Sequence, residues 1–181
     1  MKALKIGIVS LIAMFLGFHL FAQTEDWLWA KQVGGTSNDE GRSIATDSNG
    51  NSYVTGSFEG IAVFGSTTLT SSGNTDIFIA KLGCNGNWLW ATKAGGPGSD
   101  IGYGIAVDGN GNSYVTGCFR DNASFGSTTI NSSGNTDIFV AKIDSNGNWL
   151  WAQKAGGSSS DYGYGIAVDS SGNSYVTGYF R

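Results

Sequence analysis

The sequence is poor in the residues on which most enzyme and metal sites depend. Its 181 residues include one histidine, His19, two cysteines and a single proline. His19 lies in the apolar N-terminal stretch, so the rest of the chain has no imidazole base for a Ser-His-Asp or Cys-His site. A histidine-based metal site is excluded for the same reason. We therefore expect no catalytic residue, no metal site, no cofactor and no enzyme activity in this chain.

Long apolar runs are also lacking, with one exception at the N-terminus. Lys2 and Lys5 precede an apolar run from Ile6 to Phe21, and Ala22 follows it. This pattern is typical of a secretory signal peptide. The run is shorter than the roughly 20 apolar residues of a membrane-spanning helix, and no cysteine follows it for lipidation. The sequence predicts a signal peptide over 1–22, cleavage after Ala22, a secreted or cell-surface protein, and no membrane span after cleavage.

Positive charge is scarce. The chain has ten Lys and Arg residues against fourteen Asp and Glu, a formal net charge of −4, which becomes −6 when the two lysines of the signal peptide are removed. The remaining Lys and Arg residues are scattered along the chain. A surface of this kind repels phosphate backbones, so we do not expect nucleic acid as a partner.

Glycine and internal repetition, by contrast, are abundant. The chain has 29 glycines, and Trp27, Trp88 and Trp149 recur at intervals of 61 residues. Other landmarks keep the same step: Asp47, Asp108 and Asp169; Gly56, Gly117 and Gly178; Phe64 and Phe125; Asp76 and Asp137. A uniform period of this length is typical of a tandem array of one supersecondary unit.

Each unit is predicted to contain four strands and no helix. In the first unit they are Ser43–Asp47, Asn51–Gly56, Asp76–Leu82 and Asn87–Ala94. Asn-Gly or Ser-Gly pairs between the first two and between the last two are strong hairpin signals. A Ser/Thr/Gly-rich stretch separates the second strand from the third, and it is either a loop or an additional small hairpin.

The strands are almost continuously apolar, which indicates that both faces of each sheet are covered. A sandwich or a solenoid would also cover two faces, but the size of the side chains favours a propeller. The first strand carries small residues, and the fourth carries two tryptophans. Blades converge at the axis of a propeller and separate at its rim, so the inner strand must be small. The predicted fold class is all-β, with β-propeller-type four-stranded blades in a 61-residue tandem repeat.

The succession of motifs in each unit resembles a known repeat. It reads W-L-W-A, then G-G-x-x-x-D-x-G, I-A-V-D-x-x-G-N-x-Y-V-T-G and D-I-F-V-A-K. This succession is similar to the SBBP β-propeller repeat of exported bacterial proteins. The resemblance implies a four-stranded blade, but it implies neither a ligand nor a set of catalytic residues.

The number of units predicts an incomplete ring. Propellers use about 4 to 8 blades, whereas this chain has about two and a half, so we expect it to be a fragment of a longer polypeptide or one of several copies that close a ring. We also expect self-association through the open edge of the last blade. The predicted segments are a leading outer strand at 23–35, blade 1 at 43–94, blade 2 at 104–155 and a partial blade 3 at 165–181.

The two cysteines are not part of the repeated design. Cys84 corresponds to Ser145 in the next unit, and Cys118 corresponds to Ser57 and Tyr179. An export route would allow the cysteines to pair. Because neither position recurs as cysteine, we expect no disulfide between them.

Three aspartates in the crossovers between units are the candidate ligand-facing residues. Asp39, Asp100 and Asp161 occupy equivalent places in GGTSNDEG, GGPGSDIG and GGSSSDYG. In a ring these loops would lie on one face, where repeated acids could bind cations, sugars or basic peptides. The alternative is a structural role, since Asp in a Gly/Ser loop commonly forms an Asx turn.

Two further motifs have a functional and a structural interpretation. The turns of the type D-S-N-G-N resemble part of a calcium loop but lack its bidentate Glu, so a hairpin turn capped by Asp is favoured. The tryptophan pairs, such as Trp88 and Trp90, could stack on sugars, but packing between blades is favoured.

These observations predict an exported β-propeller repeat protein that acts as a non-catalytic binding or structural scaffold. Its partner would be an unknown protein or glycan. The alternative is a lectin-like module that binds glycans through the crossover loops between blades. A third hypothesis is an enzyme whose active residues lie outside this chain.

Overall fold

The computed structural model describes residues 29–181, so the predicted signal peptide lies outside the described residues. The chain divides into two units, Met1–Gln32 and Val33–Arg181, and the second contains all fourteen described strands. In the described part of the chain every regular element is a strand, as the sequence predicts. No helix in this part is long and apolar enough to cross a membrane.

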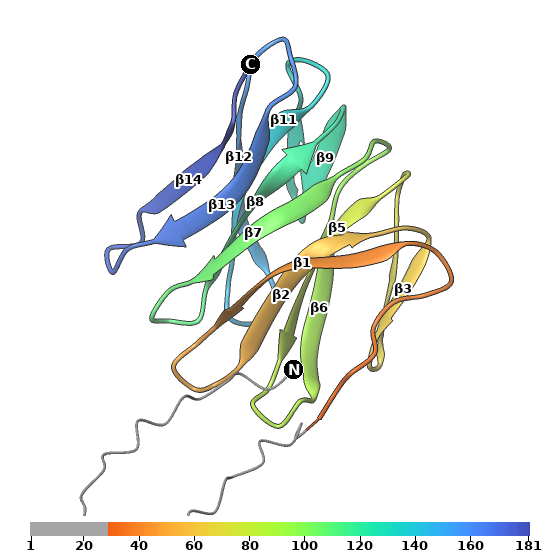
Figure 1. Cartoon of the computed structure of the whole chain (residues 1–181), viewed down its shortest axis with the longest axis vertical. Coiled ribbons are helices and arrows are strands. Elements are labelled where there is room, and N and C mark those ends of the chain that lie inside the picture. The colour runs from red at the N-terminus through yellow and green to blue at the C-terminus, as the bar shows by residue number, and fades with distance from the viewer. Residues whose placement is uncertain (1–28) are drawn as a thin grey trace, which may run out of the picture. The chain divides into compact units, whose positions relative to one another are not determined.

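Two complete four-stranded antiparallel sheets form blades 1 and 2 (Figure 1). Blade 1 has the strand order β1-β2-β5-β6, and blade 2 has the equivalent order β7-β8-β11-β12. The strands of blade 1 are β1 (Asp39–Thr46), β2 (Ser52–Phe58), β5 (Asp76–Leu82) and β6 (Trp88–Ala94). Those of blade 2 are β7 (Ile101–Val107), β8 (Ser113–Phe119), β11 (Asp137–Ile143) and β12 (Trp149–Ala155).

The partial third blade is a two-stranded sheet of β13 (Tyr162–Val168) and β14 (Ser174–Tyr179). The Ser/Thr/Gly-rich stretch of each complete blade forms a small additional hairpin rather than a loop. These hairpins pair β3 (Ile61–Phe64) with β4 (Thr67–Thr70), and β9 (Asn122–Phe125) with β10 (Thr128–Asn131). The second of the two alternatives left open by the sequence is therefore the observed one.

The first strand of each blade begins earlier than the sequence predicts. β1 begins at Asp39, whereas the predicted strand begins at Ser43. The pairing of β1 with β2 shifts register between Gly41 and Ser43, and this bulge lets the ladder continue toward the crossover. The same shift occurs in β7 and in β13. A Gly-rich stretch next to a crossover resembles a loop in the sequence, which explains the difference.

The first strands of the three blades lie side by side, with β7 between β1 and β13 (Figure 1). Close packing there requires glycine. A Cβ added at Gly102 of β7 would lie 2.3 Å from the Thr55 Oγ1 of blade 1, and a Cβ at Gly163 of β13 would lie 2.3 Å from the Thr116 Oγ1 of blade 2. The predicted taper, with small residues on the inner strand, therefore has a direct steric cause.

The main hydrophobic core lies between blades 1 and 2. It combines Ile77 and Ile79 of β5 with Ile105, Val115 and Phe139 of blade 2, all buried. A second cluster joins the small hairpin of blade 1 to its sheet, with Phe64 of β3 against Phe78 of β5 at a ring-centroid distance of 5.0 Å. Core residues thus come from both faces of the strands, as their continuous apolar character predicts.

The leading outer strand predicted at 23–35 is described only in part. Residues 23–28 lie outside the described residues, and Trp29 to Val33 have no strand assignment. Gly34 forms an isolated antiparallel bridge with Val63 of β3. Apart from this bridge, the described part of the segment has no strand pairing.

We expect the last two strands to be the least protected part of a polypeptide of this sequence. In the described chain β14 pairs only with β13, and Tyr175 and Phe180 are each 60% exposed. Free strand edges pair with other chains, and two-stranded sheets are marginally stable. Amides of β13 and β14 should exchange with solvent hydrogen faster than those of blades 1 and 2. The chain should also self-associate to a greater extent as its concentration rises. Thr177→Lys, which adds a charge at the open edge, should reduce association in sedimentation. Uniform protection to Gly178 in a strict monomer would contradict this expectation.

The two cysteines should differ in reactivity. Both are free, as the sequence predicts, with Cys84 exposed in the turn after β5 and Cys118 buried in β8. Burial raises the pKa of the Cys118 thiol to about 12, and a protonated thiol is a poor nucleophile. A thiol reagent should therefore label Cys84 in the native chain and Cys118 only after unfolding. Cys84→Ser should abolish native labelling, whereas labelling of that variant at neutral pH would show that Cys118 is accessible.

Candidate functional site

The crossover aspartates of blades 2 and 3 point into the protein. Asp100 and Asp161 are at most 1% exposed. Asp100 accepts hydrogen bonds from the backbone N–H of Gly96 at 2.8 Å and of Arg120 at 3.0 Å. Asp161 accepts the equivalent bonds from Gly157 at 2.9 Å and Arg181 at 2.8 Å. Both carboxylates thus tie a crossover to the chain that follows the second strand of the next blade. These bonds are not the Asx turn that the sequence suggests, because the donors lie four residues before and twenty residues after each aspartate.

Asp39 occupies the same place in blade 1 but makes only one of the two bonds. Its Oδ2 accepts the N–H of Gly35 at 2.7 Å, whereas Oδ1 is buried without a partner among the described residues. The N–H of Glu59, which would be the equivalent second donor, binds the Asn38 carbonyl instead. A cavity of about 30 Å³ lies beside Asp39 and Phe58, which is room for a water molecule and not for a sugar.

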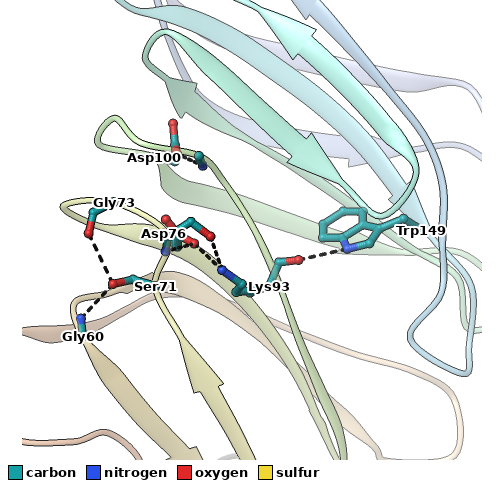
Figure 2. Close-up of polar contacts among 9 residues, drawn as sticks. Gly60, Ser71, Gly73, Asp76, Lys93, Asp100 and Trp149 are labelled. Carbon is teal, nitrogen blue, oxygen red and sulfur yellow. Dashed lines mark hydrogen bonds and ion pairs between the residues drawn. The ribbon is translucent and has the colours of Figure 1, made fainter.

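A second carboxylate faces each of the two buried crossover aspartates. Asp76, the first residue of β5, is fully buried; its Oδ2 accepts the Ser72 N–H at 2.9 Å and pairs with the Lys93 Nζ at 2.9 Å. Its Oδ1 has no hydrogen-bond partner in the described structure. Figure 2 shows Asp76 and Lys93 next to the Gly60–Ser71–Gly73 hydrogen bonds, with Asp100 on the neighbouring loop.

The two loops that carry these carboxylates run in parallel. Thr75 forms a parallel bridge with Ser99, and the Asp100 N–H binds the Thr75 carbonyl at 2.9 Å. Gly95 lies between the two side chains, where an added Cβ would be 2.8 Å from the Asp76 Oδ1 and 2.9 Å from the Asp100 Oδ2. Asp137 and Asp161 converge on Gly156 at the next junction in the same way. Sequence reasoning noted the recurrence of Asp76 and Asp137 but gave them no role at the site.

The D-S-N-G-N type turns have the hairpin geometry that the sequence favours. In the turn before β12, Asp144 accepts the N–H groups of Asn146 and Asn148 and the side-chain amide of Asn148. These bonds, led by that of the Asn148 side chain, hold the pKa of Asp144 below its ordinary value. Both carboxylate oxygens therefore bind turn donors. No group of three or more His, Cys, Asp or Glu side chains is placed to hold a metal within residues 29–181.

The recurring aromatic residues connect consecutive blades. The Tyr53 hydroxyl of blade 1 donates to the Gly111 carbonyl of blade 2 at 3.1 Å. The Trp90 Nε1 donates to the Ser145 carbonyl at 3.0 Å, and the Trp149 Nε1 donates to the Lys93 carbonyl at 3.2 Å (Figure 2). The favoured interpretation of the tryptophan pairs, packing between blades, is therefore confirmed.

The bulges of the inner strands place three large side chains in a row that sequence reasoning missed. Arg42, Tyr103 and Tyr164 are the bulged residues of β1, β7 and β13. The Arg42 guanidinium lies 5.0 Å from the Tyr103 ring centroid, and the Tyr103 and Tyr164 rings are 5.3 Å apart. We call these three residues the inner row. Their 61-residue spacing was available in the sequence, but Arg in place of Tyr conceals the equivalence.

Comparison with known proteins identifies the repeat. A family described as "Beta-propeller repeat" (SBBP) matches residues 28–57, 89–117 and 150–179. The second and third matches each run from the outer strand of one blade through the crossover into the first two strands of the next.

Two curated relatives share part of their length with this chain. The "Uncharacterized WD repeat-containing protein L264" of Acanthamoeba polyphaga mimivirus is 29% identical over 184 residues, which cover 84% of this chain and 13% of that protein. The "Regulatory protein FlaEY" of Caulobacter vibrioides is 32% identical over 152 residues, which cover 80% of this chain and 16% of that protein. The chain thus spans less than a fifth of the length of either relative. The family matches recur at the 61-residue step and in register with the observed blades, and they show that the chain carries three copies of the SBBP beta-propeller repeat.

Proposed function

We propose that the chain is an exported, non-catalytic scaffold of propeller-type blades that binds a protein partner through its inner row. The observation that carries this proposal is that most recurring residues make structural contacts, whereas those of the inner row leave surface exposed. The buried aspartates, the turn aspartates and the aromatic pairs are engaged in contacts within and between blades. The inner row, in contrast, combines large side chains with exposed surface, Tyr164 being 52% exposed.

The chemistry of the inner row suits a protein partner. Tyr and Arg are the residue types most enriched at protein interfaces, because they combine a rigid apolar body with hydrogen-bonding groups. The row is also held in place, since Arg42 pairs with Glu40 and the Tyr103 ring lies between Arg42 and Tyr164. A pre-ordered surface loses little conformational entropy on binding. One relative's printed name, a WD repeat-containing protein, also fits a binding role.

The lectin-like alternative receives less support from the geometry. It relies on the crossover loops, where Asp100 and Asp161 are buried and bind backbone N–H groups rather than facing solvent. A sugar site would also need a concave surface with several convergent polar groups. The cavity beside Asp39 is too small for one.

Parallel screens of the chain against a random peptide library and a glycan array test the binding proposal. We expect peptide ligands whose affinity falls about tenfold or more in Tyr164→Ala, because truncation of a central interface tyrosine removes apolar contact area. Leu150→Ala is the matched control, since Leu150 is equally exposed, at 52%, but lies on outer strand β12. Glycan binding without peptide binding would favour the lectin-like module. Equal losses of peptide affinity in Tyr164→Ala and Leu150→Ala would show that the inner row is not the binding surface.

Export is tested by sequencing the N-terminus of the protein from cells that express the chain. We expect a product outside the cytoplasm that begins at Gln23, because the apolar run precedes a small residue at position 22. Ala22→Arg, which places a bulky charge at the predicted cleavage site, should leave the precursor uncut. A full-length cytoplasmic product from the unaltered chain would contradict the proposal of export without affecting the binding test.

A further inference from the structure

The junction between blades 1 and 2 buries two carboxylates close to each other. Asp76 and Asp100 are both fully buried, and the Asp76 Oδ1 and the Asp100 Oδ2 lie within 2.9 Å of one point, the position that a Cβ on Gly95 would occupy. The Asp76 Oδ1 has no hydrogen-bond partner among the described residues. Buried polar atoms are almost always satisfied, so an unpartnered carboxylate oxygen that faces a second carboxylate indicates a hydrogen-bond donor that the described residues do not supply in their ionised state.

The charges around the pair do not balance when both aspartates are ionised. Lys93 of β6 is the only cation paired with either carboxylate among the described residues, at 2.9 Å from the Asp76 Oδ2. The other groups that act on Asp100 are the N–H groups of Gly96 and Arg120, the Asp121 carboxylate after β8, and the Cys118 thiol of β8. One net negative charge would thus remain buried, which is unfavourable without a partner.

We propose that the Asp76–Asp100 pair binds one proton in mildly acidic solution, and that this proton strengthens the junction between blades 1 and 2. Burial raises the pKa of Asp100 to about 6, and the neighbouring Asp76 carboxylate acts in the same direction. A protonated carboxyl can donate the hydrogen bond that the Asp76 Oδ1 lacks. The proton therefore supplies both the missing donor and the missing positive charge.

A proton fits this site better than a metal ion does. Calcium binds six to eight oxygen ligands, whereas the pair offers two convergent carboxylate oxygens, and one of them already accepts the Gly96 N–H. The Lys93 ammonium on Asp76 would also repel a divalent cation. No group of three or more potential ligand side chains surrounds the pair in the part of the chain that the structure describes.

The next junction provides an internal control. Asp137 and Asp161 converge on Gly156 with nearly the same distances. At Asp161 the N–H groups of Gly157 and Arg181 outweigh the effect of burial and hold the pKa below its ordinary value, whereas at Asp100 burial is the larger effect. We therefore expect Asp100, and not Asp161, to bind a proton between pH 5 and 7.

The sign of the pH effect follows from the direction of the shift. The folded chain holds the Asp100 proton more tightly than the unfolded chain, so the stability that this proton contributes is fully present at low pH. It is lost as the pH rises through about 6. For a single group with this shift, the unfolding equilibrium constant should rise about 20-fold between pH 4.5 and 7.5.

Carboxyl-selective NMR titration of the whole chain, with Asp76→Asn and Asp137→Asn as matched variants, tests the proposal. In the unaltered chain the carboxyl carbon signal of Asp100 should titrate with a midpoint near pH 6. An amide at position 76 can donate a hydrogen bond to the ionised Asp100 carboxylate, which replaces the bond that the shared proton makes between the two side chains. Asp76→Asn should therefore flatten the pH dependence of unfolding between pH 5 and 7 and leave the chain at least as stable at pH 7.5. Asp137→Asn should leave that pH dependence unchanged.

Three results would overturn the proposal. One is titration of the Asp100 carboxyl group below pH 5 in the unaltered chain, a measurement that does not depend on the folding of any variant. A second is a loss of stability at pH 7.5 in Asp76→Asn with an unchanged pH dependence, which is expected if Asp76 is only an ion-pair partner of Lys93. A third is stabilisation of the unaltered chain at pH 7.5 by calcium or magnesium chloride that is absent in Asp76→Asn, which would assign the site to a cation.

Discussion

The buried crossover aspartate is the group on which the stacking of consecutive blades depends. Each crossover must leave the outer strand of one blade and enter the inner strand of the next, and its backbone N–H groups find several acceptors outside that strand pair: Gly95 binds the Ser124 carbonyl of β9, and Asp100 binds the Thr75 carbonyl. Asp100 binds one of these groups, Gly96 N–H, and also the N–H of Arg120 after the second strand of the new blade. One side chain thereby sets the start of the inner strand relative to the end of its neighbour, and the glycine contacts between inner strands follow from that placement.

The sequence predicted the blades because their signals are local and repeated. Asn-Gly turns, apolar strands and the 61-residue step each depend on residues close in the chain. The early start of the inner strands was missed because it depends on a bulge, in which Arg42, Tyr103 or Tyr164 is the additional residue. A bulge arises from pairing with the second strand, and no local pattern distinguishes it from a Gly-rich loop.

The candidate site was predicted in its residues but not in its orientation. The equivalence of Asp39, Asp100 and Asp161 is evident from the spacing, whereas their direction depends on backbone donors about 20 residues away, such as Arg120 N–H. Because every residue except proline has a backbone N–H, the identity of a side chain does not show which N–H will bind the carboxylate. The unpaired Oδ1 of Asp39 shows that equivalent residues need not have equivalent surroundings, because at that position the Glu59 N–H binds a carbonyl instead.

The acidic pair at the first junction is a consequence of the same architecture. Asp76 accepts the Ser72 N–H of the loop before β5, and Asp100 accepts the Gly96 N–H of the crossover, so each carboxylate stabilises one loop. These loops lie against each other through the Thr75–Ser99 bridge, which brings the two carboxylates together. Lys93 offsets one charge and leaves the other. The charge that is left is the one that the proposed proton would neutralise at this junction.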